Sequence, residues 1–207
     1  MRLFLNDTSP FSRLVLITAL EAGVSQLDFV WVDPWACPES LLQLNPFSLV
    51  PTLEITEGEA LYESLFICDY LLAQGKGGLS HPSRDVKSLQ RYALGKLLME
   101  TAFKKVVNDR FSGADHALSE RGIVALQRAL AHLEILLAGK EEAALLSLPD
   151  LCLAVALEYT RFRLPDLFAA HAGPQTLAWL IPYQNRPSFV ATTPQRLKAQ
   201  PASLHLL

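Results

Sequence analysis

The sequence predicts a small α/β domain followed by an all-helical domain. Residues 1–80 alternate short runs of β-forming residues with segments of helical apolar periodicity. Residues 75–84 (GKGGLSHPSR) concentrate Gly, Ser and Pro, which is typical of a linker. After this stretch the strand signal disappears and long amphipathic segments follow. We therefore expect an N-terminal domain over residues 1–75 and an all-helical domain over residues 85–207.

The N-terminal domain is predicted to follow the order β-α-β-α-β-β-α. Strands are expected at residues 2–6, 27–32, 52–55 and 60–62, and helices at 10–22, 38–44 and 64–74. The first helix has the clearest ends, because Ser9 can cap it, Pro10 suits the first helical position and Gly23 stops it. A Glu57-Gly58 turn joins the last two strands into a hairpin. This order predicts a mixed sheet covered by helices.

The second domain is predicted to contain only helices. They are expected at residues 86–110, 119–137, 149–163 and 174–182, with an irregular Pro-rich stretch from Pro187. Ser147 and Asp150, three residues apart, match a capping box at the start of the most apolar of these helices. We assign this pair a structural role.

Composition limits the function to a few classes. The chain has 207 residues, half of them hydrophobic, and a formal net charge of −3 with no basic block, which argues against nucleic-acid binding. No apolar run approaches the ~18 residues of a membrane span, and the opening RLFLND does not fit a signal peptide. Three cysteines lie far apart with no metal-ligand spacing, so neither disulfides nor a metal site is expected. We expect a soluble, cytoplasmic protein.

Four short stretches, taken together, resemble the glutathione S-transferase superfamily. They are TSPFSR near the start, NPFSLVPTL at 45–53, LYESLFICDYL at 61–71 and SLPDLCLA at 147–154. The later stretch RPSFVATTP is similar to the end of many bacterial members. The resemblance implies a thioredoxin-like N-terminal domain joined to an all-α C-terminal domain. It also implies a homodimer that uses glutathione as co-substrate, with a small hydrophobic electrophile as partner and no metal or other cofactor.

Ser9 has two interpretations. As an N-cap it needs no ligand. A hydroxyl can, however, accept a bond from the first helical turn and still donate to a thiolate, and a helix N-terminus favours nearby negative charge. The resemblance implies this second role, in which Ser9 lowers the pKa of the glutathione thiol. Ser12 and Thr8 are the alternatives for that role. Because both Ser9 and Ser12 are serines, dithiol redox chemistry is not available.

The resemblance also suggests how glutathione would be held. Pro51 could be an ordinary trans proline at the start of a strand. The resemblance instead implies a cis Val50-Pro51 bond, which would leave the backbone of Val50 to pair with the cysteinyl part of glutathione. Glu63 and Ser64 suit the start of a helix, and the resemblance implies that they bind the γ-glutamyl ammonium and carboxylate.

One position departs from the pattern. Many relatives carry Lys or His just before the Val-Pro pair, whereas this chain has Leu49, so no cation is evident for the glycine carboxylate. Affinity could be weak, another residue such as Arg13 could serve, or the ligand could differ. A solvated position on the first helix suits Arg13 better. Phe11 and Phe103 are candidates for an apolar substrate pocket. The expected activity is conjugation of glutathione to an electrophile, and the alternatives are a non-catalytic binding or scaffold protein and a glutathione-dependent peroxidase or lyase.

Overall fold

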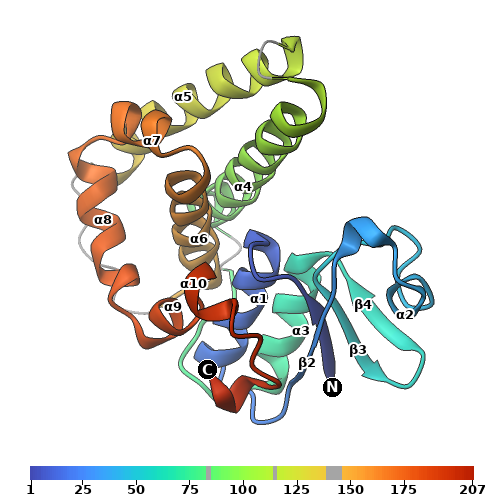
Figure 1. Ribbon diagram of the computed structural model, residues 1–207. Helices are drawn as coiled ribbons and strands as arrows, with labels where there is room; N and C mark the ends of the chain where they lie inside the picture. The colour runs from blue at the N-terminus through green and yellow to red at the C-terminus, as the bar shows by residue number, and fades with distance from the viewer. Residues whose placement is uncertain (83–84, 114–115, 139–145) are drawn as a thin grey trace. The chain divides into compact units, whose positions relative to one another are not determined.

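The computed structural model describes residues 1–82, 85–113, 116–138 and 146–207 (Figure 1). Residues 83–84 of the predicted linker lie outside the described residues. The chain forms two compact units, one from residues 1–81 with 185–207 and the other from residues 82–184. The sequence analysis placed all of 85–207 in the helical domain, whereas residues 185–207 group with the first unit.

A four-stranded mixed sheet is the centre of the first unit. Its strands are β1 (Arg2–Leu5), β2 (Asp28–Trp31), β3 (Thr52–Thr56) and β4 (Glu59–Tyr62), in the order β2-β1-β3-β4. β1 and β2 run parallel, and the other two pairs are antiparallel. Gly58 in the β3–β4 turn has a φ of 77°, which glycine adopts at no steric cost. The predicted mixed sheet and hairpin are confirmed.

Two helices pack together beside this sheet, α1 (Pro10–Glu21) and α3 (Ser64–Gln74) (Figure 1). Residues 14–19 of α1 are all buried, as expected of a helix that is apolar on every side. The Thr18 hydroxyl donates to Cys68 Sγ at 3.3 Å and so joins the two helices. Burial raises the pKa of the Cys68 thiol to about 12, so this thiol is inert. The connection between β2 and β3 holds the turn η1 (Pro34–Ala36) and the single-turn helix α2 (Glu39–Leu42).

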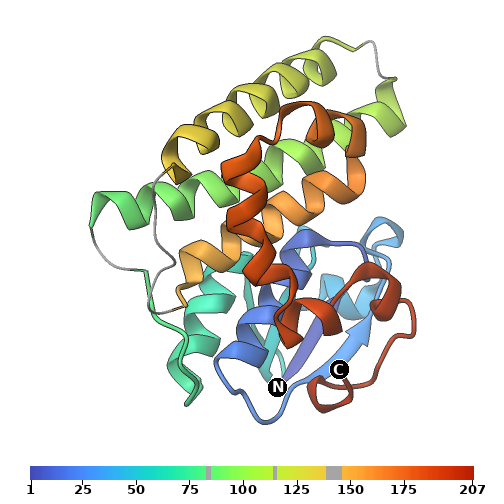
Figure 2. The same ribbon diagram turned by 90° about the vertical axis from the view of Figure 1, so that its left-hand side faces the viewer.

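Residues 185–207 are here called the closing segment. The sequence analysis expected an irregular stretch from Pro187, but the segment contains short helices. It forms α9 (Pro187–Ala191), α10 (Pro194–Leu197) and a turn η2 (Leu204–Leu206). Figure 2 shows them against the first unit. Arg186 donates two hydrogen bonds to Glu21, at 2.8 and 2.7 Å, and the Ser188 hydroxyl adds a third at 2.5 Å. These helices are too short for sequence periodicity to reveal, and tertiary contacts hold them in place.

The closing segment also covers the outer edge of the sheet. The Phe29 N–H donates to the Ala202 carbonyl at 2.8 Å, and the Trp31 indole donates to the Pro201 carbonyl at 2.8 Å. Asp28 and Ser203 form an isolated β-bridge. An open strand edge invites pairing with other chains, so this cover protects β2.

The second unit consists of helices throughout its described part. They are α4 (Val86–Ser112), α5 (Ala117–Leu137), α6 (Leu148–Arg163), α7 (Pro165–His171) and α8 (Pro174–Gln184). α6 is buried over nearly its whole length and packs on α4, where a Cβ on Gly95 would lie 2.7 Å from the Leu153 nitrogen. The N-cap half of the predicted capping box is confirmed, because the Asp150 N–H donates to Ser147 Oγ at 3.3 Å, and the Asp150 carboxylate accepts from the Ser147 hydroxyl. No helix among the described residues is long and apolar enough to cross a membrane.

Candidate functional site

The predicted ligand-binding residues lie at one end of the sheet, where β1, β2 and β4 end and β3 begins. This end is called the ligand edge, and it is distinct from the outer strand β2. Phe4 of β1 is paired with Thr52 of β3, and Thr52 is paired with Tyr62 of β4. The chain that leaves β1, the chain that enters β3 and the chain that leaves β4 therefore meet at the same edge. These are the segments that carry Ser9, Val50-Pro51 and Glu63-Ser64. Because β2 runs parallel to β1, the turn that follows Trp31 reaches this edge as well.

Ser9 is the N-cap of α1. Its Oγ accepts from the Ser12 N–H at 3.2 Å, and the residue is only half-buried. The Ser9 hydroxyl can still donate, and it lies where the helix dipole favours an anion. The alternatives are less available: Thr8 Oγ1 donates to Asn6 Oδ1 at 3.0 Å, and Ser12 Oγ is fully buried with no hydrogen-bond partner among the described residues.

The loop before β3 contains a cis Val50-Pro51 bond, as predicted. Asn45, which the sequence analysis did not single out, organises this loop from a buried position. Its side-chain amide donates to the Leu49 carbonyl at 3.1 Å and to Thr52 Oγ1 at 2.9 Å, and its Oδ1 accepts from the Phe47 N–H at 3.1 Å. Among the described residues, neither the N–H nor the C=O of Val50 makes a backbone hydrogen bond. Both groups are therefore available to an added strand.

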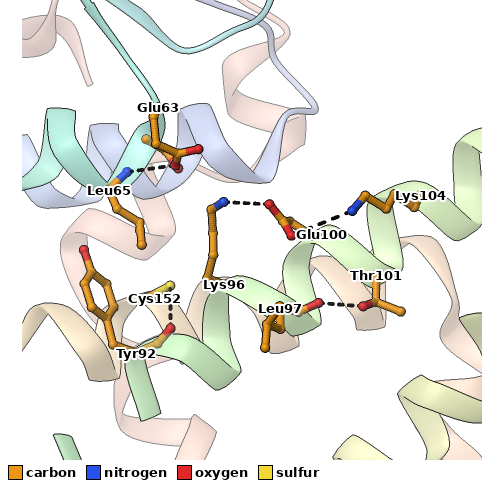
Figure 3. Close-up of polar contacts among 10 residues, drawn as sticks. Glu63, Leu65, Tyr92, Lys96, Leu97, Glu100, Thr101, Lys104 and Cys152 are labelled. Atoms are coloured by element: carbon orange, nitrogen blue, oxygen red, sulfur yellow. Dashed lines mark hydrogen bonds and ion pairs between the residues drawn. The ribbon is translucent and has the colours of Figure 1, made fainter. Parts of the chain in front are cut away.

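Glu63 and Ser64 open α3, but their roles differ from the prediction. Glu63, not Ser64, is the N-cap, and its Oε1 accepts from the Leu65 N–H at 3.3 Å (Figure 3). The same oxygen accepts from the Ser64 hydroxyl at 3.2 Å. Glu63 has a φ of 79°, a region that non-glycine residues occupy at a cost of about 1–3 kcal/mol. This edge thus brings together the exposed residue Glu63, the buried Ser64 and the N-terminus of an eleven-residue helix.

Arg13 contradicts its predicted exposure. It is buried, its Nη2 donates to the Phe189 carbonyl at 3.2 Å, and its guanidinium stacks 5.5 Å from the centre of the Phe189 ring. The bonds that hold Arg13 come from the closing segment, 176 residues further along the chain. Arg13 is therefore committed to packing, and it is not the cation for a glycine carboxylate.

The two candidate pocket aromatics belong to different units. Phe11 is half-buried on the first turn of α1, and Phe103 is half-buried on α4 of the second unit. Their part in a substrate pocket stays a prediction. Among the described residues, no group of three or more His, Cys, Asp or Glu side chains is arranged to hold a metal ion.

Comparison with known proteins fits this geometry. The family described as "Glutathione S-transferase, N-terminal domain" matches residues 8–74, which carry Ser9, Val50-Pro51 and Glu63-Ser64. The resemblance to the glutathione S-transferase superfamily that the sequence motifs indicated is thereby confirmed, with the family match itself limited to residues 8–74. The chain is 28% identical to the uncharacterised GST-like protein YibF of Escherichia coli K12 over 169 residues, which cover 79% of this chain and 83% of YibF.

Solved members of the superfamily have the same architecture. A glutathione transferase family member from Pseudomonas fluorescens Pf-5, with bound glutathione, is 29% identical with a TM-score of 0.77. A glutathione S-transferase from Methylobacillus flagellatus KT, also with glutathione bound, is 25% identical with a TM-score of 0.81. Each alignment covers 93% of this chain and 98% of the other. The predicted fold, a thioredoxin-like domain with an all-helical remainder, is thereby confirmed.

Proposed function

We propose that this superfamily member is a glutathione transferase that joins the glutathione thiolate to a small electrophile. One observation carries the proposal: the α1 N-terminus with Ser9, the unbonded backbone of Val50 and the Glu63-Ser64 pair share one edge of the sheet. Two solved relatives of 25% and 29% identity contain bound glutathione, which supports the same ligand here.

The γ-glutamyl and cysteinyl parts of glutathione each have matching groups at this edge. The γ-glutamyl head is a zwitterion, so the Glu63 carboxylate can take its ammonium while the Ser64 hydroxyl and N–H take its carboxylate. Ser64 would exchange its bond to Glu63 for one to the ligand. The cysteinyl backbone would pair with the N–H and C=O of Val50 as an added strand. This pairing would place the sulfur beside Ser9.

The reaction itself needs a thiolate and two oriented reactants. The thiol proton leaves to solvent, the sulfur forms a bond to an electrophilic carbon, and a leaving group departs with its electron pair. Ser9 and the helix N-terminus would stabilise the thiolate, and the protein would supply orientation. Glutathione is a co-substrate in this scheme, and no metal or other cofactor is part of the proposal. Phe11 and Phe103 remain candidates for contact with the electrophile.

Replacement of Ser9 tests the proposal. Ser9→Ala should cost about 1 kcal/mol of stability through the lost cap. It should also raise the pKa of the bound thiol by about one unit, which corresponds to ~1.4 kcal/mol. The measurement is a pH titration of thiolate absorbance in the glutathione complex, with Ser9→Thr as the control that keeps the hydroxyl. If the wild type and Ser9→Ala titrate at the same pH, Ser9 is only a cap.

Activity assays on the purified wild-type protein separate the alternative functions. Turnover of a chloronitrobenzene with glutathione identifies a transferase, whereas turnover of a hydroperoxide identifies a peroxidase. Tight glutathione binding without turnover of either would identify a binding protein that keeps the fold.

The proposal includes a homodimer. Three aromatic side chains of the first unit, Phe47, Tyr62 and Phe66, are exposed, and the Phe47 and Tyr62 rings contact each other at 6.3 Å. On α4, Val86, Leu89 and Leu97 are exposed as well. Exposed apolar surfaces of this kind favour protein contacts. We expect a dimer in sedimentation at micromolar concentration, and a monomer would contradict it.

We also place the protein in the cytoplasm, where its three free cysteines would stay reduced.

A further inference from the structure

We propose that the site prefers a glutathione-type thiol whose glycine end is neutral or cationic, such as the amide of glutathione with ammonia or an amine, over glutathione itself. This inference rests on the proposed function. It concerns the end of the ligand opposite the γ-glutamyl head, and four observations on the first unit carry it.

The sheet order fixes where that end must lie. With its head at Glu63-Ser64 after β4 and its middle at Val50 before β3, an extended ligand runs on past β1 towards the turn that follows β2. Strands lie ~4.8 Å apart, so this path across the edge is about 14 Å long. An extended tripeptide covers ~11 Å, and the γ-linkage of glutathione lengthens it further. The glycine end therefore comes close to η1 and to the loop before Val50.

That part of the edge is built from apolar and acidic groups. The Ser48 hydroxyl donates to the Pro34 carbonyl at 2.9 Å, so the loop before Val50 is held against η1. Trp35, Phe47 and Leu49 are 57%, 68% and 59% exposed there. The Asp33 carboxylate lies at the same turn and accepts from the Trp35 N–H at 3.0 Å.

The segments that build this part of the edge lie within residues 14–75 and carry no cation of their own. Between Arg13 and Lys76 there is no Lys, Arg or His, whereas the same stretch contains nine acidic residues: Glu21, Asp28, Asp33, Glu39, Glu54, Glu57, Glu59, Glu63 and Asp69. All the segments after β2, before β3 and after β4 lie within it.

The cations on either side of this stretch are committed or distant. Arg13 is buried against the closing segment, and Arg2 pairs with Glu54 at 2.5 Å. Lys76 follows the far end of α3, a helix that begins at Ser64 and is ~16 Å long at 1.5 Å per residue. A free carboxylate at the glycine end would thus lie among apolar side chains and be repelled by negative charge. An amide carries no charge and would not be repelled.

The test compares glutathione with its glycinamide analogue, which differs only in that charge. We expect calorimetry at low salt to show the glycinamide binding about three- to tenfold tighter, with the ratio shrinking at high salt because exposed charges are screened over ~3 Å at 1 M and ~30 Å at 0.01 M. Leu49→Lys should reverse the preference, and the matched neutral variant Leu49→Gln should leave it unchanged. Leu49 suits this exchange because its side chain is exposed and its structural bonds use only its carbonyl.

The outcomes separate the two claims. If neither thiol binds the wild type, the proposed function falls and this inference falls with it. If both bind and glutathione is preferred, or if Leu49→Lys does not shift the ratio, only this inference is overturned. In that case the glycine carboxylate finds its cation outside residues 14–75.

Discussion

The two ends of α1 are built in opposite ways. At its C-terminal end, Glu21 accepts two bonds from Arg186 and one from Ser188, and the Ala22 carbonyl accepts from the Gly77 N–H at 2.7 Å. At its N-terminal end, Ser9 is half-buried with a hydroxyl free to donate. The neighbouring backbone of Val50 makes no hydrogen bond within the described part of the chain.

This contrast separates stability from function along a single helix. Polar groups that are fully paired stabilise the fold and have nothing left to offer a ligand, whereas groups with spare donors and acceptors cost stability and can bind. We therefore expect substitutions at the Glu21 end to change unfolding and those at the Ser9 end to change ligand binding.

The largest effect is expected at Glu21. Glu21→Ala removes the acceptor of three hydrogen bonds, two from Arg186 and one from Ser188, and the loss of this partly buried charged partner should cost about 2–3 kcal/mol. Urea unfolding should detect this loss while the glutathione dissociation constant stays within twofold. Glu21→Gln, which keeps one acceptor oxygen, should cost less. An equal loss of ligand affinity would show that the two ends are coupled.

Asn45 should affect both stability and ligand binding, because it lies at the ligand edge but is buried and fully hydrogen-bonded. Asn45→Ala removes three hydrogen bonds, at a cost of about 2 kcal/mol, because the Phe47 N–H loses its acceptor and the Leu49 carbonyl keeps only its bond from the Thr52 hydroxyl. The loop around Val50 should loosen, so glutathione affinity should fall in parallel with stability.

The control at this position is Asn45→Asp, which keeps the acceptor for the Phe47 N–H but loses both donors. It should lower both stability and affinity at least as far as Asn45→Ala does, because its buried carboxylate would face the Leu49 carbonyl with no donor between them. Unchanged affinity in Asn45→Ala would mean that the loop does not depend on this side chain for its binding geometry.

Low pH should reduce the stability that Glu21 contributes at the C-terminal end of α1. Burial opposes ionisation of Glu21, but the hydrogen bonds from Arg186 and Ser188 outweigh it, so its pKa lies below the usual 4.5. A depressed folded-state pKa contributes stability that is fully present above the unfolded-state value and is lost as the pH falls through the folded-state value. Wild-type stability should therefore fall below about pH 4.5, and the fall should be shallower in Glu21→Gln, as followed by urea midpoints at several pH values. Identical slopes would contradict the assignment.

Ser12 should give the smallest effect. Its Oγ is fully buried without a partner among the described residues, so Ser12→Ala removes an unpaired polar group and should change stability by less than about 1 kcal/mol, in the stabilising direction. The pKa of the bound thiol should not move. A rise in that pKa would instead identify Ser12 as the thiolate donor in place of Ser9.

Local signals in the sequence were sufficient for most of the first unit. Ser9, Pro10 and Gly23 mark the ends of α1 because caps and stops act within a few residues. The hairpin at Gly58 and the capping box at Ser147 are local in the same way.

The missed features depend on distant residues. Arg13 looks like a solvated helix position until Phe189 packs on it, and α7 and the helices of the closing segment are too short to show a period. Asn45 could not be recognised from the sequence, because its role depends on hydrogen bonds to loop residues that are set only once the loop has folded. The exchange of roles between Glu63 and Ser64 reflects a positive φ that propensity does not predict for Glu.

The place of the closing segment has a consequence for the order of folding during synthesis. Residues 1–81 leave the ribosome first, but their β2 edge and the partners of Arg13 and Glu21 are supplied by residues 185–207. At 5–20 residues per second, the ~100 residues in between take roughly 5–20 s to be made. The helical unit can therefore fold while the first unit is still unfinished. For those seconds the nascent chain exposes an unpaired strand edge, and it is then that the protein most needs a chaperone.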